Sequence, residues 1–141
     1  MNLLLLGSGG REHAIAWKLT KSPRCEKLFV APGNAGTAQC GTNVNINPND
    51  FDAIKKFCLA EDIGMVIVGP EEPLVNGIVD SFREDSTVNH IPVFGPSKEG
   101  AQLEGFVAHA PTDFVADAVR KSVSATNACR NRYRPDPPRF I

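Results

Sequence analysis

Residues 2–13 read NLLLLGSGGREH, and this stretch decides the fold. The four leucines Leu3–Leu6 favour a short strand that is buried on both faces, as strands of parallel sheets are. Gly7-Ser8-Gly9-Gly10 follows as a tight turn of small residues. Apolar residues at helical spacing then run from Arg11 to Lys21, and Ser22-Pro23 ends that pattern. The stretch therefore predicts a strand, a glycine turn and a helix, the first unit of a parallel α/β sheet.

Strand and helix patterns continue to alternate beyond this unit, which predicts a doubly wound parallel sheet with helices on both faces. Trp17 and Phe82 have apolar neighbours at helical spacing, so both are predicted to lie in the core. Further strands are expected over 27–31, 44–46, 65–68 and 91–94. Helices are expected over 50–61 with Asp50 as N-cap, over one stretch from Pro73 to Phe82, and over 97–103 with Ser97 as N-cap.

Composition excludes several classes of protein. The chain has 141 residues, of which 42% are hydrophobic and 22% charged, and these values are typical of a globular domain. A net charge of -1 argues against nucleic-acid binding through overall basicity. The run Leu3–Leu6 is too short for a membrane span or a signal peptide, so a cytoplasmic protein without membrane contact is expected. Cys25, Cys40, Cys58 and Cys129 lie far apart, which predicts free thiols, with Cys58 in the core.

The character of the sequence changes at Gly105. Residues 1–105 hold 9 basic and 13 acidic side chains, whereas residues 106–141 hold 6 and 3. Periodicity fails after Arg120, and the stretch 130–139 is rich in arginine and proline. These observations predict one folded domain over 1–105 and an irregular, disordered tail over 106–141.

Three loops of small or acidic residues follow strands of the predicted sheet. They are Gly7–Gly10, Pro32–Thr37 and Gly69–Pro73. In an open parallel sheet such loops lie along one edge, where ligands bind. Gly7–Gly10 also opens a helix, whose free N–H groups attract anions, so a phosphate fits there. Each loop taken singly also fits an ordinary turn.

The residues of these loops limit which ligands and reactions the predicted site can support. The glycine spacing is not G-x-G-x-x-G, and the second strand ends in Ala31-Pro32 rather than in the acidic residue typical of an NAD site. Glu71 or Glu72 is a candidate acceptor for hydroxyl or amine protons of a substrate. His13 has two interpretations, a donor to the ligand or a side chain that packs locally. No catalytic triad and no metal cluster is seen in the sequence, so no catalytic or metal-ligating residue is predicted.

Five short segments of the sequence resemble motifs of a known family. They are residues 7–18 (GSGGREHAIAWK), 31–37 (APGNAGT), 68–75 (VGPEEPLV), 94–97 (FGPS) and 101–105 (AQLEG). Together they resemble the N-terminal domain of phosphoribosylamine–glycine ligases. The resemblance implies a Rossmann-like pre-ATP-grasp fold and a ligase that joins glycine to 5-phosphoribosylamine with ATP, through a glycyl phosphate, in purine biosynthesis. It also implies that substrate is bound by Gly9, Gly10, Arg11, Glu12, His13, Gly33, Asn34, Gly36, Thr37 and Glu71.

The likeness is expected to stop after Gly105, where the family continues into an ATP-grasp domain. ATP and Mg²⁺ are implied by the family, but the domain that binds them is absent from this sequence. The chain is therefore predicted to be a truncated or frameshifted form, or a true short variant, that does not catalyse alone. Two alternatives remain open at this point: a stand-alone module that binds a sugar phosphate or nucleotide, and, more weakly supported, an NAD(P)-binding domain.

Overall fold

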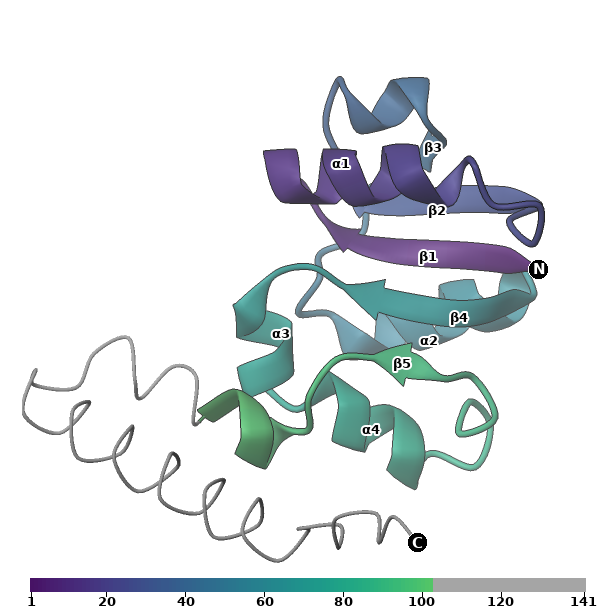
Figure 1. Cartoon of the computed structure of the whole chain (residues 1–141). Coiled ribbons are helices and arrows are strands. Elements are labelled where there is room, and N and C mark those ends of the chain that lie inside the picture. The colour runs from purple at the N-terminus through teal and green to yellow at the C-terminus, as the bar shows by residue number, and fades with distance from the viewer. Residues whose placement is uncertain (103–141) are drawn as a thin grey trace, which may run out of the picture. The chain divides into compact units, whose positions relative to one another are not determined.

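The computed structural model describes residues 1–102. Within them a five-stranded, all-parallel sheet has the strand order β3-β2-β1-β4-β5 (Figure 1). The strands are β1 (Asn2–Gly7), β2 (Lys27–Pro32), β3 (Thr42–Asn43), β4 (Ile63–Val68) and β5 (Val93–Phe94). Leu3–Leu6 pairs in parallel with Met65–Val68, as the strand–helix alternation predicts. The prediction of a Rossmann-like parallel sheet is thus confirmed, whereas the expected tail over 106–141 lies outside the described residues.

Helices cover both faces of the sheet because side chains of β1 point alternately to opposite sides. Leu3 and Leu5 pack with Ala16 of α1 (Gly10–Leu19) on one face. Leu4 and Leu6 belong to a larger cluster on the other face. That cluster also takes in residues of α2 (Phe51–Ala60), α3 (Glu71–Val75) and α4 (Ile78–Glu84). A short 3-10 helix, η1 (Thr37–Gln39), precedes β3.

Several local predictions are confirmed. The Asp50 carboxylate caps α2 by accepting a hydrogen bond from the Ala53 N–H at 3.0 Å. Cys58 is fully buried, and burial raises the pKa of its thiol to about 12. Phe82 is 1% exposed and lies in the core. Ser97 accepts hydrogen bonds at the start of the helical residues 98–102.

The prediction that Trp17 lies in the core is wrong. The side chain is 56% exposed, and the Lys21 ammonium lies 5.4 Å from the centre of its ring. Successive helix positions differ by about 100° around the axis. Because Ala16 of α1 faces the sheet, Trp17 points outward.

Several element boundaries also differ from the predictions: β4 begins at Ile63 rather than at Met65, and β5 is Val93–Phe94 rather than 91–94. The third strand is Thr42–Asn43 rather than 44–46, because the Ile46 N–H donates to the Val44 carbonyl and this tight turn takes the chain out of the sheet. The expected single helix from Pro73 to Phe82 is two helices, α3 and α4. Gly77 separates them with a positive φ of 90°, a conformation that suits glycine and ends a helix.

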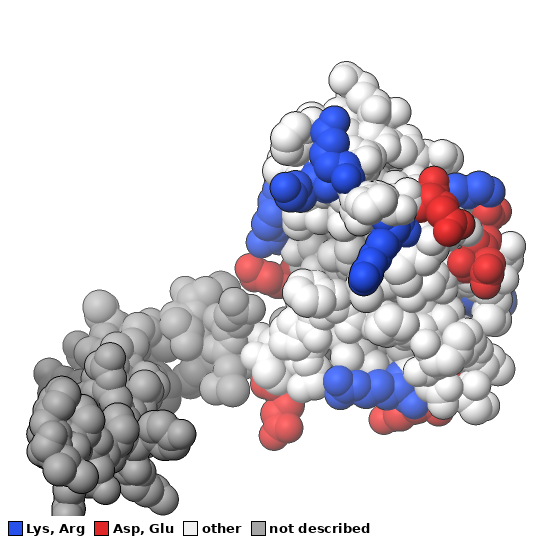
Figure 2. Space-filling view, turned by 45° about the vertical axis from the view of Figure 1, so that its right-hand side comes forward, with Lys and Arg blue, Asp and Glu red and all other residues white. Residues whose placement is uncertain are grey.

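The surface of the described residues has no single sign of charge. On the face shown in Figure 2, basic and acidic side chains are interspersed among uncharged ones. None of the helices described in residues 1–102 is both long enough and apolar enough to cross a lipid bilayer.

Candidate functional site

The three loops predicted to share one sheet edge do so, and backbone hydrogen bonds tie them together. We call residues 7–12 the first loop, 32–37 the second and 69–73 the third. The Gly33 N–H donates to the Gly7 carbonyl at 3.1 Å, and the Gly69 N–H donates to the Leu6 carbonyl at 3.1 Å. The end of the central strand β1 therefore holds the second and third loops on either side of the first.

A cavity of about 330 Å³ opens at this edge. Its walls come from the first loop, the third loop and the connection 47–49, and β2 contributes Pro32. It lies at the carboxyl end of β1, where the strand order reverses: β2 and β3 lie on one side of β1, and β4 and β5 lie on the other. This position is the usual ligand crevice of an open α/β sheet. Of the residues predicted to bind substrate, Gly9, Arg11 and Glu12 line this cavity.

Glu12 is the buried acid of the first loop, with 5% of its surface exposed. Its Oε2 accepts a hydrogen bond from the Gly9 N–H at 2.7 Å, and its Oε1 pairs with Arg11 Nε at 3.2 Å. As the third residue of α1, it satisfies the free N–H of the residue that caps the helix. Both oxygens therefore already have partners within the protein.

Arg11 bridges the first and third loops. Its Nη2 donates to the Gly69 carbonyl while its Nε contacts Glu12. The side chain is still 61% exposed and lies at the cavity wall. A guanidinium has five N–H donors in a planar fork, so Arg11 retains donors for an anionic ligand.

Apart from Pro32, the second loop supports the first loop and does not line the cavity. Asn34 Nδ2 donates to the Ser8 carbonyl at 2.7 Å and to the Gly9 carbonyl at 3.2 Å. The Asn34 Oδ1 accepts from the N–H groups of Gly36 and Thr37, which closes the loop on itself. Thr37 is fully buried, and its hydroxyl bonds within the loop and to Asn43. Asn34 therefore contacts the backbone of the first loop, and Thr37 holds Asn34 in place.

His13 packs against the second loop. A Cβ atom placed on Gly36 would lie 2.6 Å from His13 Nδ1, so the glycine leaves room for the imidazole ring. The side chain is half-buried and is not among the cavity residues. This position corresponds to local packing, the second of the two interpretations of His13.

Gly10 differs from the other glycines near the cavity. Nothing lies within 4 Å of a Cβ atom placed there, whereas one at Gly9 would lie 2.8 Å from Glu12 Oε2. Gly10 is exposed and is the first residue of α1. The open approach to a helix start is therefore at Gly10.

Nine cavity residues are absent from the predicted binding set. Six of them belong to the three loops, namely Gly7, Ser8, Pro32, Pro70, Glu72 and Pro73, and the other three are Asn47, Pro48 and Asn49. Glu72 was a candidate proton acceptor alongside Glu71, and only Glu72 lines the cavity. Residues 47–49 carry no sequence signal beyond their polar side chains. They lie between β3 and α2 in the chain, and only the fold brings them to the cavity.

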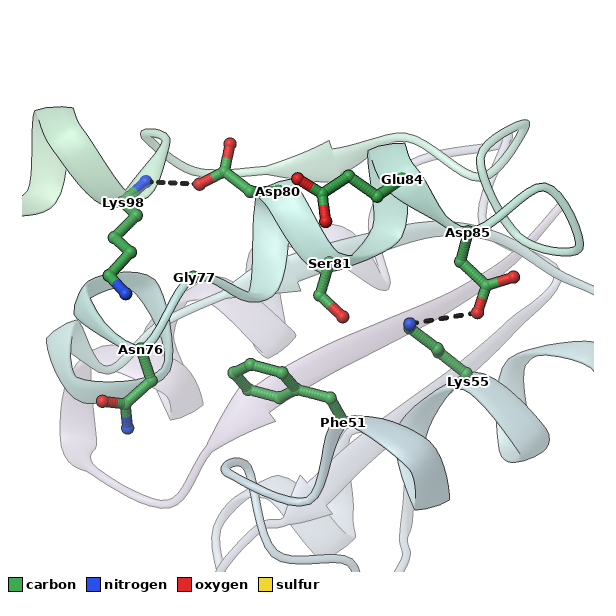
Figure 3. Close-up of a pocket in the computed structure, with 9 residues that line it drawn as sticks. All are labelled: Phe51, Lys55, Asn76, Gly77, Asp80, Ser81, Glu84, Asp85 and Lys98. Atoms are coloured by element: carbon green, nitrogen blue, oxygen red, sulfur yellow. Dashed lines mark hydrogen bonds and ion pairs between the residues drawn. The ribbon is translucent and has the colours of Figure 1, made fainter.

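A second groove, of about 500 Å³, lies away from the three loops (Figure 3). Two of its acids have partners: Asp85 Oδ2 lies 3.0 Å from Lys55 Nζ, and Asp80 Oδ2 accepts a hydrogen bond from the backbone N–H of Lys98 at 2.8 Å. Hydrogen bonds from the Thr87 hydroxyl and from Lys55 lower the pKa of Asp85 to about 2. No residue of the predicted binding set lines this groove, so the smaller cavity is the candidate site.

A parallel sheet of this strand order, with a cavity at the carboxyl ends of its central strands, places the chain in the Rossmann-like α/β class. The family model "Phosphoribosylglycinamide synthetase, N domain" matches residues 1–104. The chain belongs to this family, which confirms the resemblance carried by its sequence segments.

Individual relatives agree. The phosphoribosylamine–glycine ligase of Haemophilus influenzae is 53% identical over 118 residues, covering 82% of this chain and 26% of that protein. The enzyme of the same name from Rhodopirellula baltica is 50% identical over 104 residues, covering 74% and 23%. A crystal structure of the Thermotoga maritima enzyme covers 70% of this chain and 20% of that one, at 30% identity and a TM-score of 0.44.

Two facts about extent accompany these matches. The chain spans about a quarter of the length of the curated relatives it matches. The alignment to the Haemophilus influenzae ligase covers a larger share of the chain than residues 1–105 make up, so it runs further than the point at which the likeness was expected to stop. The family model itself ends at residue 104.

Proposed function

We propose that the cavity at the carboxyl edge of the sheet binds the phosphorylated ribose of 5-phosphoribosylamine. The observation that carries the proposal is the coincidence of the cavity with the first and third loops, inside a domain whose relatives are named phosphoribosylamine–glycine ligases. In this proposal the domain supplies one substrate-binding part of a cytoplasmic ligase that joins that amine to glycine.

Arg11 and Glu72 of the cavity and the neighbouring Gly10 have distinct roles in the proposal. The exposed start of α1 at Gly10 and the free donors of Arg11 face the phosphate, because helix N-termini and guanidinium groups both favour anions. Glu72 accepts hydrogen bonds from hydroxyl or amine groups of the sugar. The remaining residues of the predicted set act by shaping and joining the three loops, namely Gly9, Glu12, His13, Gly33, Asn34, Gly36, Thr37 and Glu71.

The described residues do not fit ATP with Mg²⁺, the cofactors that the family resemblance implies. Magnesium in nucleotide sites needs carboxylates with free oxygens, and phosphoryl transfer needs cations placed on the phosphates. In residues 1–102 no three His, Cys, Asp or Glu side chains gather in a metal-binding group. Of the acids at the cavity, Glu12 is engaged at both oxygens, which leaves Glu72. We therefore derive no nucleotide step from these residues.

The Arg11→Ala variant is expected to bind ribose 5-phosphate more weakly by about 1.5–3 kcal/mol, the range for a hydrogen bond to a charged group. Titration calorimetry on the full chain measures this loss directly. Arg83→Ala is the matched control, because Arg83 is 70% exposed and lies outside the cavity. Equal affinities in Arg11→Ala and the unmodified chain contradict the role given to Arg11.

Gly10→Ala is expected to separate binding from stability. The added methyl group meets nothing within 4 Å, and alanine favours helix over glycine, so the melting temperature is expected to stay the same or rise slightly. The same methyl group narrows the approach to the start of α1, so affinity for ribose 5-phosphate is expected to fall. Thermal melting and calorimetry on one preparation test both halves, and a variant that binds normally argues against phosphate at Gly10.

The stand-alone sugar-phosphate module remains the second candidate, since the same cavity serves both functions. Binding of ribose 5-phosphate without turnover fits either one. Competition by glycine-bearing or amine-bearing ribose phosphates discriminates them, because a ligase domain is expected to prefer the 1-amino sugar. A titration with NAD is expected to show no binding, given that Pro32 stands at the end of β2.

A further inference from the structure

Glu12 is enclosed by glycines from two separate loops. A Cβ atom on Gly7 would lie 2.6 Å from Glu12 Cγ, and one on Gly9 would lie 2.8 Å from Oε2. A Cβ atom on Gly69, in the third loop, would overlap Oε1. Cβ atoms in proteins essentially never come so close to other atoms. These glycines therefore leave space for a side chain of the protein itself.

The enclosed carboxylate also holds the two loops together by hydrogen bonds. Its Oε2 fixes the N–H of Gly9, directly before the exposed Gly10. Its Oε1 fixes the guanidinium of Arg11, whose far end reaches the Gly69 carbonyl. A path of contacts thus runs from the first loop through Glu12 and Arg11 to the third loop.

We propose that Glu12 is a positioning residue of the candidate site rather than a group that touches the ligand. Its carboxylate sets the conformation of the first loop and aims the Arg11 guanidinium, so that both walls of the cavity keep one geometry. A buried polar group satisfied at both oxygens is costly to disturb, which makes it suitable for fixing a loop. The link to ligand binding rests on the proposed function, whereas the link between the loops does not.

A double-mutant cycle tests the enclosure without any ligand. Gly69→Ala is expected to lower the melting temperature, because the new methyl group collides with the Glu12 side chain. In a Glu12→Ala background the collision partner is gone, so the further loss from Gly69→Ala is expected to be smaller by about twofold or more. If the losses of melting temperature from Gly69→Ala and Glu12→Ala simply add, the Glu12 side chain is not enclosed by Gly69.

Glu12→Gln tests positioning while keeping the side-chain shape. An amide cannot accept from both Gly9 and Arg11, because one end of it is a donor. Native-state hydrogen exchange of the Gly9 N–H is expected to accelerate about tenfold or more, the factor for losing one charge-assisted bond. Glu84→Gln is the matched control, since Glu84 is exposed and lies outside the cavity. Glu12→Ala leaves no acceptor for the Gly9 N–H, so unchanged exchange at Gly9 in both Glu12→Gln and Glu12→Ala overturns the proposal.

Affinity for ribose 5-phosphate provides the third measurement. Glu12→Gln is expected to raise the dissociation constant about tenfold while the chain remains folded. Normal affinity in this variant shows that Glu12 does not position the ligand site, which overturns the proposed link between Glu12 and ligand binding. If the unmodified chain binds no ribose 5-phosphate, the proposed function fails, and the cycle and the Gly9 exchange still decide whether Glu12 fixes the loops.

Discussion

Phe82→Ala is expected to lower the free energy of unfolding by about 3–5 kcal/mol, the usual cost of removing a buried phenyl ring. Phe82 is 1% exposed in the larger hydrophobic cluster, and the Lys55 ammonium lies 5.9 Å from its ring centre. The loss combines the transfer of the ring to water with the cavity that it leaves. Because small domains have only about 5–15 kcal/mol in total, the variant is expected to be largely destabilised.

Denaturant unfolding measures this change, and the chain offers a matched control. Phe94 is 71% exposed on the short edge strand β5, so Phe94→Ala is expected to change the stability by no more than about 0.5 kcal/mol. Similar losses in both variants contradict the position of Phe82 in the core. A loss in Phe94→Ala alone contradicts the exposure of Phe94.

A purified polypeptide of these 141 residues is expected to form no detectable glycinamide ribonucleotide from ATP, glycine and phosphoribosylamine. A ligase must hold ATP phosphates and magnesium and shield a reactive acyl phosphate from water. The described residues provide one candidate cavity, and they do not fit Mg²⁺ and ATP. The chain also spans about a quarter of the length of its relatives.

The measurement is release of ADP that depends on magnesium and on both co-substrates. The full-length Haemophilus influenzae ligase, assayed in parallel, shows that the reagents are competent. ADP release by the 141-residue chain that requires both glycine and phosphoribosylamine contradicts the prediction. Such a result means that residues beyond the described part, or several copies of the chain, complete a site.

The sheet was predictable because its strands are encoded locally. Leu3–Leu6 and Met65–Val68 are apolar runs between glycine or proline turns, and parallel packing needs little more than that pattern. The edge strand Thr42–Asn43 was not predictable, because two residues pair only when β2 is already in place. The break between α3 and α4 at Gly77 was missed for a different reason. The glycine that makes the left-handed turn is present in the sequence, but apolar residues at helical spacing continue across it and indicate one helix.

The sequence predicts which loops form the candidate site, but it does not predict which side chains line the cavity. The order of strands and turns places three loops at one edge, which requires only topology. Which of Glu71 and Glu72 lines the cavity depends on the rotation of α3, and the sequence fixes no such angle. Residues 47–49 arrive from a distant connection, so no motif marks them. Glu12 belonged to the predicted set, but its burial depends on Gly69, far away in the chain.

The arrangement around Glu12 affects how a glycine-rich turn is interpreted from sequence. Such turns are commonly taken as a signature of bound phosphate. In this domain a Cβ atom on Gly7 or Gly9 would collide with the Glu12 side chain, whereas one on Gly10 would meet nothing within 4 Å. The glycines at positions 7, 9 and 69 therefore describe the space taken by the side chain at position 12. In this chain a glycine-rich turn reflects an internal acid as well as an approach to a helix start.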